Sequence, residues 1–196
     1  MSNLSNIKTR EAIKAAFFTL LEGKSLEKIK ILEICERARI NRGTFYYHYY
    51  AKEDLIQHLI EEYIQAFIQS MEEGLQLNKI TKISTKPNQS VYNLFEKCRE
   101  FASEINMLFQ HDLKELIQQK LRTNIQKYFM ENIQSYTQVN EKDIDFHVGI
   151  KTNQLVFGIL YFIENYQTYS VNEFADVYMY STESTTREIL VKEKRD

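Results

Sequence analysis

The chain has 196 residues, a formal net charge of −2, and a composition that is 43% hydrophobic, enough to build a substantial core. Only 5 glycines and 1 proline interrupt it. Because β-rich folds need frequent turns that draw on these two residues, the composition disfavours them and predicts an all-α fold. Cys35 and Cys98 have no CxxC or Cys/His spacing, so we expect no metal and no cofactor. We found no signal-peptide core, and the longest apolar run is far shorter than the roughly 20 residues of a membrane span. We therefore expect a cytoplasmic protein with no membrane partner.

Charge is unevenly distributed along the chain. Residues 1–56 contain 10 Lys and Arg against 7 Asp and Glu, whereas the remainder contains 15 against 20. A basic amino-terminal segment on an acidic body suggests an anionic partner at one end only.

Three helices are predicted first, of which the second and third are short. Apolar residues recur at i, i+3, i+4, i+7 and i+8 from Ile13, which indicates an amphipathic helix of about 15 residues ending near Gly23. A second helix is expected over residues 31–38. After a brief turn, the side chain of Asn41 can accept a hydrogen bond from a free amide and cap a third helix that ends around Tyr49.

Longer helices follow. One is predicted from about Lys52 to Leu77, and the polar segment 78–90, which holds Pro87, is the clearest linker. Further helices are expected at about 91–107, 112–135, 142–167 and 171–190. Ser170 and Glu173 have the spacing of a capping box at the start of the last helix. The helix before it is apolar nearly all round from Leu155 to Ile163, which indicates that this part is buried on more than one side. A single small domain could bury it, but a subunit interface is the simpler explanation.

Residues 31–55 read ILEICERARINRGTFYYHYYAKEDL. They predict a helix-turn-helix, because two short helices meet here at a tight turn and another helix precedes them. Arg42 can offer a bidentate fork to guanine, and Thr44 can meet a phosphate or a thymine methyl group. Gly43 lets the start of the helix approach a duplex closely. The residues expected on the inner faces of the helices are Ile34, Ala38, Ile40, Phe45 and Tyr49. The remaining candidate DNA contacts are Tyr46, Tyr47, His48 and Lys52, and we expect the last two to reach phosphate oxygens.

The run from Arg42 to Tyr49, followed by Lys52-Glu53-Asp54-Leu55, resembles the signature of the TetR/AcrR family of transcriptional regulators. The resemblance covers roughly residues 9–56 and is only architectural beyond them. It implies a nine-to-ten-helix homodimer with a helix-turn-helix DNA-binding domain over 1–51 and a helical ligand-binding and dimerisation domain over 52–196. It also implies double-stranded DNA as partner and repression relieved by a small molecule. Carried over by position, the DNA contacts are Arg42, Gly43, Thr44, Tyr46, Tyr47, His48 and Lys52.

Three positions depart from the family pattern. Lys30 stands where threonine often begins the second helix; it cannot cap by accepting a hydrogen bond, but it can meet phosphate as a cation. Arg39 replaces the usual glycine of the turn, at a cost of about 1–2 kcal/mol if the backbone there is left-handed. Ala51 replaces a Ser or Asn cap worth about 1 kcal/mol.

The body carries weaker candidates. A small apolar or cationic lipophilic ligand is hypothesised from the aromatic residues and one acidic residue of the body. An alternative is a DNA-bound adaptor whose helical body docks a partner protein. No catalytic motif appears, so an enzyme is not expected. The candidate ligand residues are Tyr92, Phe95, Phe101, Glu104, Phe109, Tyr128 and Tyr161; those for the dimer interface are Phe157, Gly158, Tyr161, Tyr178, Ser181 and Thr185.

Overall fold

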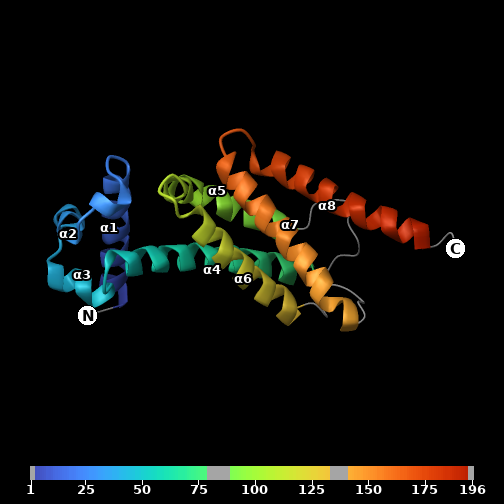
Figure 1. Cartoon of the computed structure of the whole chain (residues 1–196), viewed down its shortest axis with the longest axis horizontal. Helices are drawn as coiled ribbons and strands as arrows, with labels where there is room; N and C mark the ends of the chain where they lie inside the picture. Colours follow the sequence, from blue (N-terminus) through green and yellow to red (C-terminus); the bar gives the residue numbers. More distant parts are fainter. Residues whose placement is uncertain (1–2, 79–88, 133–140, 194–196) are drawn as a thin grey trace. The chain divides into compact units, whose positions relative to one another are not determined.

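The computed structural model describes residues 3–78, 89–132 and 141–193, and within these ranges every regular element is helical (Figure 1). The all-α prediction is confirmed, with eight α-helices and two 3-10 turns in the described residues. The predicted linker proline, Pro87, lies outside them. The elements are α1 (Asn3–Leu21), η1 (Leu26–Lys28), α2 (Ile31–Ala38), α3 (Arg42–His48), α4 (Lys52–Asn78), α5 (Gln89–Phe109), α6 (Lys114–Asn132), η3 (Glu141–Asp143), α7 (Ile144–Glu164) and α8 (Val171–Glu193).

The chain divides into two compact units. The first unit comprises Met1–Tyr63 together with Glu104–Lys114, and the second comprises Ile64–Ser103 together with Glu115–Asp196. The first unit therefore contains the whole of the predicted DNA-binding domain, the first turns of α4 and the end of α5.

The first unit is built on one apolar core, because α1, α2 and α3 each turn an apolar face inward. The amphipathic spacing that begins at Ile13 is confirmed, although α1 starts ten residues earlier, at Asn3. The side chains of Ile13, Phe17, Ile34 and Phe45 are completely buried. This core holds α1, α2 and α3 in a fixed arrangement.

The turn between α2 and α3 is left-handed at Arg39, where φ is 57° and ψ is 43°. The Ile40 amide donates to the Cys35 carbonyl over 3.0 Å, which closes the end of α2. A side chain at this φ costs about 1–2 kcal/mol relative to the glycine that the family pattern favours. The turn keeps its shape despite the substitution because its flanking helices are packed.

The other two departures are offset by carboxylates three residues downstream. Glu33 Oε2 accepts from the Lys30 amide over 3.1 Å at the start of α2, where a threonine cap is missing. Asp54 Oδ2 accepts from the Tyr50 amide over 2.9 Å at the start of α4, beside Ala51. Both helices thus satisfy an end amide with an acidic side chain, which also suits the positive end of the helix dipole.

The second unit has an aromatic core. The Phe95 ring of α5 contacts the rings of Phe162 (5.3 Å between centroids), Phe174 (4.8 Å) and Tyr178 (5.3 Å) from α7 and α8. The capping box at the start of α8 is confirmed, since the Ser170 amide donates to Glu173 Oε2 over 2.9 Å and the Glu173 amide to Ser170 Oγ over 3.3 Å. These contacts fix α8 against α5 and α7.

Gly158 and Tyr178, both predicted at the dimer interface, lie against each other within one chain. A Cβ added at Gly158 would lie 2.6 Å from Cε2 of Tyr178, and Gly158 is buried. The glycine therefore allows α8 of the same chain to approach α7, rather than a second subunit.

Candidate nucleic-acid interface

The start of α3 is fixed by Asn41. Its Oδ1 accepts from the Thr44 amide over 2.7 Å and from the Thr44 hydroxyl over 3.1 Å, which confirms the predicted cap. A Cβ at Gly43 would lie 3.2 Å from this same oxygen, so glycine leaves room for the cap. The cap therefore sets where the reading helix begins and which way the Thr44 side chain points.

α3 separates buried from exposed aromatic rings. Phe45 and Tyr49 are buried in the core of the first unit, as predicted, and their rings lie 5.8 Å apart. Tyr46 and Tyr47 are exposed, the latter at 65% of its surface. An exposed tyrosine presents a flat apolar body with a hydrogen-bonding tip, a combination suited to a duplex.

Arg42 lies at the first position of α3 and is exposed. Its Nη2 donates to the Tyr46 hydroxyl over 3.4 Å, and its guanidinium carbon lies 5.9 Å from the centre of the Tyr46 ring. The ring therefore supports the guanidinium on the outer face of the helix. A guanidinium held in this way loses less conformational freedom when it binds.

His48 ends α3 and is half-buried. Burial lowers the pKa of its imidazole below the ordinary value, and the charge of Arg10 lowers it further. At neutral pH the ring is therefore uncharged and can offer one N–H to a phosphate, but no full positive charge.

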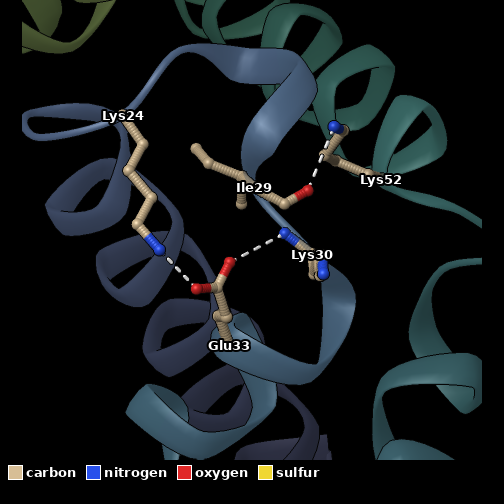
Figure 2. Close-up of polar contacts among 5 residues, drawn as sticks. All are labelled: Lys24, Ile29, Lys30, Glu33 and Lys52. Carbon is tan, nitrogen blue, oxygen red and sulfur yellow. Dashed lines mark hydrogen bonds and ion pairs between the residues drawn. The ribbon is translucent and has the colours of Figure 1, made fainter.

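Lys52 has contacts that sequence analysis missed (Figure 2). Its Nζ donates to the carbonyl oxygen of Ile29 over 3.1 Å, as Figure 2 shows. It also donates to the carbonyl oxygen of Leu26 over 2.6 Å, and the side chain is half-buried. The predicted phosphate contact stays a prediction, but this lysine already joins the start of α4 to the connection between α1 and α2. No local pattern signals a contact across 23 to 26 residues.

Glu33 organises the other side of the same connection (Figure 2). One carboxylate oxygen accepts from the Lys30 amide, and the other pairs with the ammonium of Lys24. The hydrogen bond from Lys24, followed by the one from the Lys30 amide, lowers the pKa of Glu33. The Lys30 ammonium is exposed beside this network, consistent with its predicted role as a phosphate-facing cation.

The predicted ligand residues fall in both units, and their shared ligand site stays a prediction. Glu104 and Phe109 belong to the first unit, whereas the others belong to the second. Glu104, expected to face a cationic ligand, instead accepts hydrogen bonds from the Tyr63 hydroxyl and the Lys14 ammonium. Phe95 and Tyr128 are buried core residues. At these two positions the aromatic residues are part of the core.

A solvent-open hollow of about 500 Å³ does lie in the second unit, but its lining is polar. The Tyr92 hydroxyl, a predicted ligand group, donates instead to Asp176 Oδ1 over 3.1 Å. The Phe101 ring packs on Phe67 with the Lys97 ammonium above it. The hollow is lined by Ser70, Glu73, Asn93, Glu96, Lys97, Arg99 and Glu100.

The residues predicted at the dimer interface differ in their exposure to solvent. Phe157 is 69% exposed, and Tyr161 and Ser181 are exposed as well. Thr185 lies outside the residues whose side chains the structure describes. Exposed aromatic rings at Phe157 and Tyr161 of α7 suggest a surface that another molecule covers.

Two absences hold for the described ranges. None of the helices there is long and apolar enough to cross a membrane. Likewise, in residues 3–78, 89–132 and 141–193, no three His, Cys, Asp or Glu residues are grouped so that they could hold a metal ion.

A three-helix unit with a left-handed turn, a capped third helix and an exposed Arg and Tyr face defines a helix-turn-helix protein. Residues 13–59 match the family model of the bacterial regulatory proteins, tetR family. Over this segment the chain is similar to members of that family.

One curated relative is the uncharacterized HTH-type transcriptional regulator YxbF of Bacillus subtilis (strain 168). It is 41% identical over 56 residues, which are 28% of this chain and span only 15% of the relative's length. The similarity is therefore confined to one segment of each chain.

Solved structures resemble most of the chain. The dihydroxyacetone kinase operon activator DhaS matches with a TM-score of 0.61 at 15% identity, over 93% of this chain and 97% of that one. The regulator FadR from Bacillus subtilis in complex with stearoyl-CoA matches with a TM-score of 0.56 at 16% identity, over 88% and 94%. At these identities the likeness concerns the fold alone.

Proposed function

We propose that the chain is a dimeric transcriptional regulator that inserts α3 into the major groove of double-stranded DNA. The observation that carries this proposal is the division of α3 into a buried face, Phe45 and Tyr49, and an exposed face that presents Arg42 and Tyr47. A helix with a guanidinium and a phenol on its free side suits base edges and phosphates. The match of residues 13–59 to the tetR family model supports the same function.

The dimer places two such helices on one duplex. Large apolar residues of α7 are exposed at Phe146, Ile150, Phe157 and Tyr161, whose spacings of four and seven residues put them along one helix face. We infer that a second copy covers this face. Two α3 helices about 34–36 Å apart, or a multiple of that distance, would read a near-palindromic operator.

The decisive experiment selects binding sites from random duplexes with the purified protein and then measures affinity by fluorescence anisotropy. We expect a near-palindrome, and affinity that falls steeply as salt rises, since phosphate contacts release counterions. Failure to enrich any motif, with no binding at low salt, would contradict the proposed function.

We further propose repression that a small apolar ligand relieves. The pairing of Glu104 with Lys14 removes the main reason to expect a cationic ligand. Stearoyl-CoA, which is bound in the FadR structure, is the first probe because its acyl chain is apolar. Titrating stearoyl-CoA into the protein–operator complex should release the DNA. A reporter gene placed behind the operator decides between repression and activation.

A DNA-bound adaptor remains the second candidate, because the exposed apolar residues of α7 and α8 would also suit a partner protein. Light scattering separates the two. A dimer in which Phe157 is protected from solvent favours the first proposal. A monomer that keeps this face exposed favours the adaptor.

A further inference from the structure

Lys14, Tyr63 and Glu104 form a polar cluster in the first unit, with one residue each from α1, α4 and α5. Glu104 Oε2 lies 2.8 Å from the Lys14 ammonium and accepts from the Tyr63 hydroxyl over 2.7 Å. The same ammonium lies 4.8 Å from the centre of the Tyr63 ring. A single carboxylate oxygen therefore joins three helices that are distant in sequence.

The cluster is sheltered from solvent. Tyr63 is 2% exposed, and the side chains of Lys14 and Glu104 are 19% and 32% exposed. Burial and the adjacent Glu104 charge raise the pKa of the Tyr63 phenol, so it stays protonated and donates. A charge-assisted hydrogen bond in this setting is stronger than an exposed ion pair, which water and salt screen.

Glu104 is also the residue at which α5 enters the first unit. The residues of α5 up to Ser103 belong to the second unit, and among them Phe95 packs in the aromatic core of that unit. α5 is one continuous helix from Gln89 to Phe109. None of the three cluster residues is a candidate DNA contact.

We propose that Glu104 is a positioning residue for DNA binding: by holding Lys14 of α1 and Tyr63 of α4 on the end of α5, it keeps the reading unit in its DNA-binding arrangement. The inference rests on the proposed function. Through Glu104, the end of α5 sets the position of α1, and α1 shares its apolar core with α3. Disturbance of this cluster lowers DNA affinity although no DNA-facing side chain changes.

The test uses Glu104→Gln in the full-length protein with the selected operator. Removing a negative charge by itself strengthens binding to a polyanion. Loss of the cluster does the opposite, and we expect binding about tenfold weaker than wild type, equal to about 1.4 kcal/mol. The dependence of affinity on salt should keep its slope, since no phosphate contact is lost.

Two further variants sharpen the comparison. Glu11→Gln removes the same charge from an exposed position of α1 and should bind as tightly as wild type or slightly tighter. Lys14→Met should weaken binding as Glu104→Gln does, and Lys14→Arg, which keeps the charge and can donate to the carboxylate, should restore most of it. Circular dichroism checks the fold of each variant. If Glu104→Gln does not fold, Tyr63→Phe carries the test, because it removes a donor to Glu104 without changing the net charge and should also weaken binding.

The outcomes separate the two claims. If wild type binds the operator and folded Glu104→Gln binds equally or more tightly, the positioning role is wrong and the proposed function stands. If wild type binds no duplex at all, the proposed function fails and this inference fails with it.

Discussion

The ammonium of Lys52 lies 2.6 Å from the carbonyl oxygen of Leu26 and 3.1 Å from that of Ile29. It thereby joins the start of α4 to η1 and to Ile29, the residue that follows η1. It adds a charged donor to the Leu26 carbonyl, which also accepts from the Ile29 amide over 3.3 Å. A cation suits this place because it also complements the negative end of a helical segment.

Replacing this lysine separates its two possible roles. Lys52→Met should lower the free energy of unfolding by about 1–3 kcal/mol, since two half-buried carbonyl groups lose a charged donor. If it also contacts phosphate, the slope of log affinity against log salt should fall by about 1. Urea unfolding and anisotropy titrations measure the two effects. Lys30→Met, an exposed lysine of the same connection, should leave stability unchanged.

Arg42→Ala should weaken binding to the selected operator by about 1–3 kcal/mol, because the guanidinium that Tyr46 supports is removed from the outer face of α3. Anisotropy on the operator and on a scrambled duplex gives the loss of specificity. Lys127→Ala removes one positive charge from an exposed position of α6 and serves as the control. Equal affinities for Arg42→Ala and wild type would exclude a reading role.

Gly158→Ala should destabilise the protein by about 1–3 kcal/mol, because the new Cβ would lie 2.6 Å from the Tyr178 ring. Gly149→Ala is a matched control in the same helix, where an added Cβ meets nothing within 4 Å. It should be neutral or stabilising, since alanine has the higher helix propensity. Thermal unfolding of both variants compares them. Similar melting temperatures would show that α8 adjusts freely.

His48 predicts a specific pH dependence of stability. Because burial lowers its pKa in the folded state, the unfolded chain binds a proton more readily. The contribution of His48 to stability is therefore greatest above its ordinary pKa of about 6.5 and is lost as the pH falls below it. Urea unfolding at pH 8 and pH 5.5 should show a smaller acid loss for His48→Gln than for wild type. Arg10→Gln should also reduce the loss, because it removes the second cause of the shift.

Phe157→Glu should convert dimers to monomers, because it puts a charge in the middle of the exposed apolar face of α7. Light scattering across a range of protein concentrations measures the dissociation constant. Lys151→Glu changes an exposed polar position of the same helix and is the control. A Phe157→Glu variant that remained fully dimeric would move the interface to another surface.

Local patterns in the sequence predicted the helices and the orientation of α3. The cap from Asn41 to Thr44 and the capping box from Ser170 to Glu173 each span three residues, and a helix repeats its apolar face every three or four. Backbone geometry alone brings such residues together, so they can be recognised without a structure.

Only the tertiary structure decided which charges were free. Lys52 and Glu104 resemble surface residues available for phosphate or ligand, yet Lys52 bonds to carbonyl groups 23 and 26 residues earlier and Glu104 to a lysine 90 residues earlier. A charged side chain does not reveal its partner by its own position, because a buried or half-buried charge is stabilised by whichever opposite group the packing of distant helices places beside it.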